Sequence, residues 1–437
     1  MTAAAVRSLG LRAVDRRPLA IAPYRRLWTA SVVCAAGGSF SVVAVPAQLF
    51  AVTGSSAAVG LAAGVSFAAL VVAALWGGAL ADVMDLRRLL LAADCGLALT
   101  YAGLWIQAAL GATSIPVLLV LVACQGLTYG AIMTTMGAVV PRLVPAELLP
   151  AANSLGSLVR YAGAICGPVL AGVLIPLVGL GPLYLFDAVA LTAVVWAVAA
   201  LPPLPPPPDG ARRRNRSVAG QVWTGFGYLA AGRLLVAVLA VDLAAMVFGM
   251  PVALFPELAR HTYGGPAGGG VELGLLYAAY PAGVCAAGLL SGTFTYARRQ
   301  GALMAAAAAV WGLTVVLLGL APRLWAALAA LVLGGAANCV LSAFRNAITQ
   351  AHTDDAMRGR IQGALTVVLI GGPQIANLVH GAAAAAYGPR MVVCAGGLLT
   401  TTTVAAIAWA APRLRHYTTG HPAGAGPRRP ARRSGAA

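Results

Sequence analysis

The stretch from Trp76 to Leu89 constrains the fold of this chain most strongly, because it places four charged residues between two long apolar runs. The charges are Asp82, Asp85, Arg87 and Arg88, and the apolar runs cover residues 57–80 and 88–110. Runs of this length match the ~20 residues that a helix needs to cross the hydrocarbon core of a bilayer. The stretch therefore predicts two membrane-spanning helices joined by a very short, positively charged loop.

The composition agrees with a membrane protein. Of the 437 residues, 60% are hydrophobic and only 9% are charged, which is more apolar surface than water-soluble domains of ordinary size can bury. The net charge of +17 arises from 29 arginines, without a single lysine. Because these arginines lie in loops and tails rather than on one aromatic-lined soluble face, we expect no nucleic-acid partner.

Apolar runs continue along the whole chain in two groups of six. They cover residues 28–52, 57–80, 88–110, 116–140, 151–177 and 181–201, then 233–256, 271–294, 301–320, 323–346, 362–386 and 391–411. The proline-rich segment 201–209 cannot be helical and is followed by four arginines, which indicates a linker. The predicted domains are a cytoplasmic arm (1–22), a six-helix bundle (23–201), a cytoplasmic linker (202–220), a second six-helix bundle (221–412) and a disordered cytoplasmic tail (413–437).

The positions of the arginines predict the orientation, since cytoplasmic loops retain positive charge during insertion. With both termini in the cytoplasm, most arginines fall in inside segments. Only Arg260, Arg323 and Arg390 fall in loops that face outside. The chain is therefore expected to be a multi-pass protein of a bacterial cytoplasmic membrane with both termini inside.

Several enzyme classes are excluded by missing motifs. Without lysine, the phosphate-binding motif Gly-x-x-x-x-Gly-Lys cannot occur, and neither His-Glu-x-x-His nor Gly-x-Ser-x-Gly is present. The seven cysteines stand singly inside apolar runs, without the spacing of a metal site or a disulfide framework. We expect no enzymatic activity, no cofactor and no metal, so transport would draw on ion or substrate gradients.

The two halves of the chain repeat one another. Segments 140–155 and 351–365 each carry charged and polar residues and lead into the fifth apolar run of their half. A duplication of six helices with a charged linker is typical of a transporter whose halves rock about a site near the middle of the membrane.

With these features the chain resembles the major facilitator superfamily over nearly all of residues 23–412, which implies an all-α membrane fold of twelve transmembrane helices in two pseudo-symmetric six-helix bundles. The resemblance rests on the loop between the second and third helices, where the family latches the cytoplasmic ends together. The residues that it marks as this gate are Gly78, Asp82, Asp85, Arg87, Arg88 and, nearby, Asp94. Segments 24–28, 145–155 and 358–360 are similar to the branch of bacterial siderophore and drug exporters.

The fifth helix carries a second motif of that family. Gly163, Gly167, Pro168 and Gly172 resemble part of its antiporter motif, although Ser154 stands where a further glycine is expected. Close packing through small residues is the alternative interpretation, because glycines four residues apart favour helix contacts in any membrane bundle.

Charged residues inside apolar runs are the first candidates for transport, because an ionised side chain at mid-bilayer costs about 2.5 to 3.5 kcal/mol and therefore tends to face water or the bundle interior. Asp242 and Arg345 are the preferred pair for exchanging a proton for a substrate, with a permanent structural ion pair as the alternative. Arg160 and Asp187 lie a turn or two from a predicted helix end, where capping or snorkelling is an equal alternative.

Polar stripes at helical spacing supply further candidates. Asn338, Ser342, Arg345 and Thr349 share one face, as do Thr366, Pro373, Asn377 and His380, and as do Gln125 and Tyr129. Such stripes either line a cavity or form hydrogen bonds between helices. His380 by itself is more often a core residue than a proton carrier.

The function predicted from these features is export of small amphiphilic molecules, such as drug-like compounds or a secondary metabolite, by alternating access and proton antiport. The expected partners are a small-molecule substrate, protons and the lipid bilayer, and the protein is expected to act as a monomer. A proton-coupled metabolite importer and a membrane sensor without transport activity are the alternatives.

Overall fold

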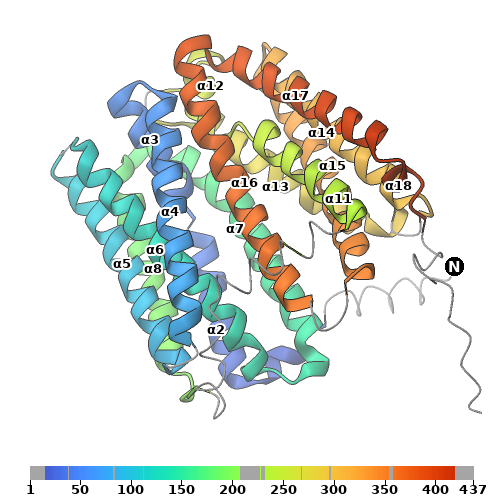
Figure 1. The fold of residues 1–437 in the computed structure, drawn as a ribbon. Coiled ribbons are helices and arrows are strands. Elements are labelled where there is room, and N and C mark those ends of the chain that lie inside the picture. The colour runs from blue at the N-terminus through green and yellow to red at the C-terminus, as the bar shows by residue number, and fades with distance from the viewer. Residues whose placement is uncertain are drawn as a thin grey trace, which may run out of the picture.

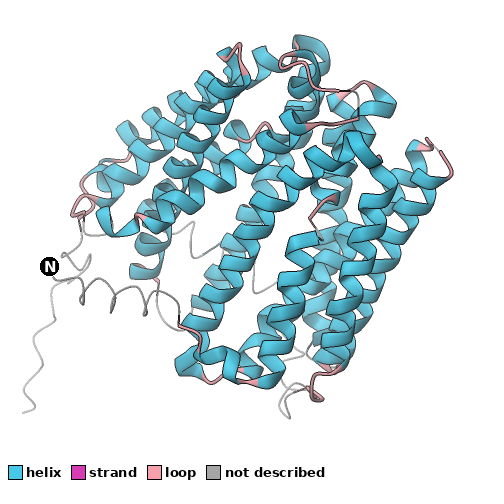
Figure 2. Ribbon diagram, turned by 180° about the vertical axis from the view of Figure 1, so that it is seen from behind, coloured by secondary structure: helices cyan, strands magenta, loops and turns pink. Residues whose placement is uncertain are grey.

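A computed structural model describes residues 15–37, 39–81, 84–111, 113–206, 227, 232–266, 268–294, 297–353 and 358–418. Within these residues the structure contains helices and connecting loops and no strand (Figure 2). The predicted all-helical membrane fold is thereby confirmed. Most of the predicted arm, most of the linker and most of the tail lie outside the described residues.

The N-terminal half consists of elements that follow its six apolar runs. They are η1 (Arg17–Ala20), α2 (Ala22–Gly37), α3 (Ser41–Thr53), α4 (Ser56–Ala81), α5 (Leu86–Ala109), α6 (Ile115–Leu143), η2 (Ala146–Leu148), α7 (Leu149–Val178) and α8 (Leu180–Ala199). The pairs α4–α6, α5–α8 and α5–α6 pack against each other, with α2 against α7 and α8.

The C-terminal half follows the second group of runs. Its elements are α11 (Arg233–Gly249), η3 (Val252–Leu254), α12 (Phe255–His261), α13 (Val271–Leu289), η4 (Ser291–Thr293), α14 (Gln300–Leu320), α15 (Leu324–Ala351), α16 (Arg358–Tyr387), α17 (Pro389–Ala410) and α18 (Pro412–Arg415). Here α14 packs against α15 and α17, and α13 packs against α15. The internal repeat is visible in detail, because the turns α7–α8 and α16–α17 both pass through a glycine with φ of +78°, Gly179 and Gly388.

Ten helical segments in the described residues are long and apolar enough to cross a membrane. The other two predicted spans correspond to α2 with α3, and to α16. The first predicted span, residues 28–52, is thus not one continuous helix: α2 ends at Gly37 and α3 begins at Ser41. The seventh is interrupted as well, at Gly249–Pro251, where a proline removes a backbone donor.

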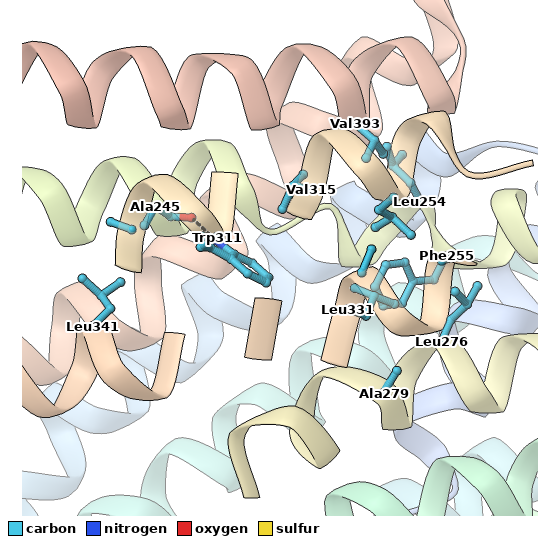
Figure 3. Close-up of a cluster of buried hydrophobic side chains, with 14 of the residues drawn as sticks. Ala245, Leu254, Phe255, Leu276, Ala279, Trp311, Val315, Leu331, Leu341 and Val393 are labelled. Atoms are coloured by element: carbon cyan, nitrogen blue, oxygen red, sulfur yellow. Dashed lines mark hydrogen bonds between the residues drawn. The ribbon is translucent and has the colours of Figure 1, made fainter. Parts of the chain in front are cut away.

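The largest hydrophobic cluster lies mainly in the C-terminal half and joins it to α3 and α7. Trp311 of α14 is at its centre: the ring is 2% exposed, and its Nε1 donates to the carbonyl of Ala245 on α11 at 3.0 Å (Figure 3). The same cluster contains the buried side chains of Leu254, Leu276 and Leu331, which lie around Phe255. This cluster fixes α11 and α14 to each other.

The two halves meet chiefly along two helix pairs, α4 with α16 and α7 with α13. Figure 1 shows the N-terminal half in blue to green beside the C-terminal half in yellow to red, with α3 and α12 close together at one end. Small residues allow the close approach. A Cβ on Gly60 would lie 2.4 Å from the carbonyl oxygen of Asn377, and one on Gly172 would lie 2.7 Å from that of Gly270.

Candidate transport site

An ion pair is buried inside the C-terminal half. Nη1 of Arg345 on α15 donates to Oδ1 of Asp242 on α11 at 2.7 Å, and the two side chains are 4% and 0% exposed. The other carboxylate oxygen of Asp242, Oδ2, has no hydrogen-bond partner among the described residues. The structure therefore joins the two charges that the sequence singled out and leaves one carboxylate oxygen able to accept a proton.

Further polar residues of α15 continue this site along one helix face. Asn338 and Thr349 are buried with Arg345, and Ser342 donates to Oδ1 of Asn338 at 3.3 Å. Arg345 also donates from Nε and Nη2 to Oδ1 of Asn346, both at 3.2 Å. Part of the predicted polar stripe is therefore held together by a hydrogen bond between two of its own residues, Ser342 and Asn338. Hydrogen bonding of this kind is one of the two roles that the sequence allows for such a stripe.

The polar residues of α16 lie beside the interruption of the seventh span. Oδ1 of Asn377 accepts from the backbone N–H of Ala253 in η3 at 3.0 Å, so this side chain satisfies a donor that the helix break sets free. His380 is 4% exposed, and its Nδ1 has no partner within the described part of the chain. The side chain of Thr366 lies outside what the structure describes.

In the N-terminal half, the two candidates on α6 have different surroundings. Gln125 donates from Nε2 to the hydroxyl of the buried Tyr101 on α5 at 3.4 Å. Tyr129, one turn further along, is 45% exposed. Glycines on the neighbouring face explain the placement of α6, because a Cβ on Gly126 would lie 2.1 Å from the carbonyl oxygen of Ser66 on α4.

Arg160 lies near the middle of α7 rather than at its end. It is exposed, and its Nη2 donates to Oγ of Ser157 at 2.9 Å, one turn toward the helix N-terminus. About 16 Å of helix separates it from Leu149, at 1.5 Å per residue. Arg160 thus lies about three turns into the helix, rather than the one or two turns expected from the sequence.

The glycine motif of α7 packs in two directions. Gly163 lies against Ala35 near the end of α2, where an added Cβ would come within 3.1 Å of the Cβ of Ala35. Gly167 lies against Ser39, between α2 and α3, where an added Cβ would come within 2.4 Å of the Cβ of Ser39. Pro168 and Gly172 lie against α13, because a Cβ on Gly274 would be 2.3 Å from the Pro168 carbonyl oxygen and 3.0 Å from Cα of Gly172. The motif therefore forms part of the contact between the two halves.

The predicted cytoplasmic gate is described only in part. Gly78 lies near the C-terminal end of α4, and Asp82 lies outside the described residues. Asp85 caps α5 by accepting from the N–H of Arg87 at 2.8 Å and also accepts from the N–H of Leu204. Arg87 donates to the carbonyl of Ala199, so both residues hold the end of α8 and the start of the proline segment.

Two other gate residues have different surroundings. Arg88 is exposed, while Asp94 is buried in α5 with Oδ2 unpartnered among the described residues.

The sequence pattern does not predict two hydrogen-bond contacts made by buried or half-buried acids. Asp187 on α8 is 0% exposed, and its Oδ2 accepts from both the N–H, at 2.8 Å, and the hydroxyl of Ser41, the first residue of α3. Glu257 on α12 accepts from the hydroxyl of Ser56 at the start of α4, across the two halves. The glycines before Ser41 are the sequence signal that could have located the first contact, because glycine disfavours a continuous helix.

The polar side chains described above come from both halves of the chain. The candidate charged and aromatic side chains come from α6 and α7 in the N-terminal half and from α11 and α15 in the C-terminal half. In the described part of the chain, no group of His, Cys, Asp and Glu is arranged to hold a metal ion. The described polar groups are thus a buried ion pair with one unpartnered carboxylate oxygen and an exposed arginine.

Comparison with known proteins matches the chain to a family model over residues 15–420, described as transmembrane secretion effector. An enterobactin exporter of Shigella boydii is 30% identical over 357 residues, covering 81% of this chain and 83% of that protein. The enterobactin exporter of Escherichia coli K12 is 29% identical over 377 residues, covering 86% and 88%.

Solved structures resemble the fold. The nucleoside transporter NupG has a TM-score of 0.66 at 14% identity, covering 88% of this chain and 98% of that one. A bacterial homologue of the iron transporter ferroportin, in an inward-facing state, has a TM-score of 0.63 at 15% identity, covering the same shares. At this identity the likeness shows the fold. With the family match over nearly the whole chain, it follows that the protein belongs to the transmembrane secretion effector family of major facilitator superfamily transporters.

Proposed function

We propose that this protein exports a small amphiphilic molecule from a bacterial cell by alternating access and exchanges it for protons. The observation that carries the coupling is the Asp242–Arg345 pair, since its 2.7 Å ion pair leaves Oδ2 of the carboxylate unpartnered among the described residues. Export, rather than import, is supported by the relatives, which are named as exporters of enterobactin. Both termini and the arginine-rich loops would face the cytoplasm.

The contacts between halves support a mechanism of rocking bundles. These contacts involve the start of α4, the second half of α7, the start of α13 and the second half of α16. In α4 and α7 the contacts lie toward the helix end that is far from the loops around Asp85 and Arg142. With those loops in the cytoplasm, the described structure is closed toward the outside. Separation of Ser56 from Glu257 would then accompany the opposite state.

Proton exchange follows from the electrostatics of the pair. While Asp242 is ionised, Arg345 neutralises it in a low-dielectric interior, and breaking such a pair costs about 3 to 5 kcal/mol when one charge is left uncompensated. Protonation of Oδ2 removes that restraint and allows Arg345 to move toward another acceptor. One charge moving through 100 mV supplies roughly 2.3 kcal/mol, which sustains more than a tenfold gradient.

Transport in proteoliposomes tests the proposal. Enterobactin or a lipophilic dye is loaded inside, and efflux is measured with and without an imposed pH gradient for wild type, Asp242→Asn and Arg345→Ala. We expect the gradient to accelerate efflux in wild type and not in either variant, while Asp242→Asn still exchanges substrate down its own gradient. Asp15→Asn is the matched control, because Asp15 pairs with Arg17 at the same 2.7 Å but on the exposed surface. Gradient-driven efflux that survives in Asp242→Asn would remove this pair from the coupling mechanism.

A further inference from the structure

The inner face of α7 carries a polar stripe. Asn153, Ser157 and Arg160 follow one another at i, i+4 and i+7 and therefore share one side of the helix. Seven residues beyond Arg160, on nearly the same side, Gly167 packs against Ser39 just before α3, since an added Cβ would lie 2.4 Å from the Cβ of Ser39. This side of α7 thus points toward α3.

Because α3 is surrounded by helices of both halves, the side of α7 that points toward α3 faces the interior of the molecule. Helix α3 contacts α4, α6, α7 and α8 of its own half and α12 and α13 of the other half. Leu170, Val173 and Leu177 lie about 80 to 140° around the helix from Arg160 and are 43%, 42% and 73% exposed, as expected of a surface covered by lipid. Arg160 therefore lies on a different side of α7 from this apolar surface.

The guanidinium of Arg160 is not neutralised by the residues that the structure describes. Its Nη2 donates a hydrogen bond to the hydroxyl of Ser157. The ion pairs among the described residues are Arg17–Asp15 and Arg345–Asp242, and neither includes Arg160. An arginine offers five N–H donors, so most of its donors remain available. A permanently charged side chain near the middle of a membrane helix is costly unless water or a ligand meets it.

Phenol rings lie near this charge. Tyr129 of α6 lies within electrostatic range of Arg160. Tyr161, next in sequence, lies within such range of Tyr280 on α13, which in turn is near Asp242 and Arg345. Phenol rings of α6 and α7 thus lie beside the unpaired cation.

We propose that Arg160 binds an anionic oxygen group, a carboxylate or phenolate, of an aromatic substrate. Guanidinium binds such groups through paired, charge-assisted hydrogen bonds, and aromatic side chains accept the ring of the ligand. This specificity rests on the proposed transport function and defines its substrate class.

Binding measured apart from transport tests this assignment. Purified protein in lipid nanodiscs is titrated, by tryptophan fluorescence or calorimetry, with matched aromatic acids and their neutral amides, from salicylate and salicylamide to the naphthoates and naphthamides. Wild type should bind the acids about tenfold or more tightly than the amides. Arg160→Gln should lose that preference while still binding the amides, and Arg160→Lys should keep part of it, because the charge remains without the planar fork.

Arg323→Gln, an exposed arginine at the start of α15, is the control for the loss of one positive charge and should bind as wild type does. Thermal unfolding confirms that each variant is folded. Absence of acid-selective binding across the series in wild type, or its persistence in Arg160→Gln, would overturn the assignment. Acid-selective binding without any efflux would instead contradict the proposed export and leave this binding site in place.

Discussion

At the scale of single residues, Asp187 shows how a buried acid supports an unusual backbone. The carboxylate sits where the first span resumes as α3, and it satisfies the N–H and hydroxyl of Ser41 at that new helix start. A helix N-terminus carries a partial positive charge and unsatisfied donors, so an acid is stabilising there. The acid thus makes a broken helix tolerable inside the bundle.

Removing this acceptor should destabilise the protein. Asp187→Ala leaves the buried Ser41 N–H and hydroxyl without a partner, at a cost of about 1 to 3 kcal/mol each, whereas Asp187→Asn keeps an acceptor oxygen and should cost less. Thermal unfolding of the purified variants in detergent measures the difference, with Ser41→Ala showing the share of the hydroxyl. Equal destabilisation by alanine and asparagine would mean that the charge, and not the hydrogen bonds, holds α3.

At the scale of elements, the contact of α7 with α13 depends on the absence of side chains. Gly172 and Gly274 face each other so closely that their backbones are in van der Waals contact. Such contacts replace the hydrophobic effect, which does not drive association of helices within lipid. Because the contact joins the two halves, under the proposed alternating access it would stabilise one transport state rather than the fold of either half.

A bulky residue at this contact should therefore shift the conformation. In Gly172→Val the new Cβ would lie 2.7 Å from the Gly270 carbonyl oxygen, which forces α7 and α13 apart. We expect a Ser56→Cys reporter, at a position only 2% exposed, to react faster with a membrane-impermeant maleimide in that background. Gly156→Val is the matched control on the same helix, because nothing lies within 4 Å of its Cβ. Unchanged labelling in Gly172→Val would show that this contact does not control closure.

At the scale of the whole molecule, the distribution of arginine determines how the bundle sits in the membrane. Arg299 and Arg323 are exposed at opposite ends of α14, a helix of 21 residues that is long enough to cross the bilayer. The charge pattern predicts that the first faces the cytoplasm and the second faces outside.

Labelling from one side checks this orientation. An impermeant maleimide should modify Arg323→Cys in intact cells and Arg299→Cys only after the membrane is opened. The parent protein with its seven native cysteines gives the background signal in each condition. The reverse pattern of labelling would invert the orientation proposed for both termini and the direction assigned to transport.

Much of the architecture is contained in the sequence itself. The spans at 57–80, 88–110 and 301–320 match α4, α5 and α14 within two residues, because in lipid a backbone must satisfy its hydrogen bonds locally and an apolar run has little choice but to be a helix. The sequence predicts the pairing of Asp242 with Arg345 for a related reason, since isolated charges are costly inside an apolar bundle.

The tertiary structure decided what each polar side chain does. Periodicity places Arg160 and Asp187 on helices but does not show which neighbour each one meets, since that depends on how helices distant in sequence pack. The fold puts Asp187 against the N-terminus of α3 and leaves Arg160 exposed, with a hydrogen bond to Ser157. The sequence therefore determined which segments are helical, because lipid imposes that locally, and only packing between helices determined which charges are neutralised and which remain available to a ligand.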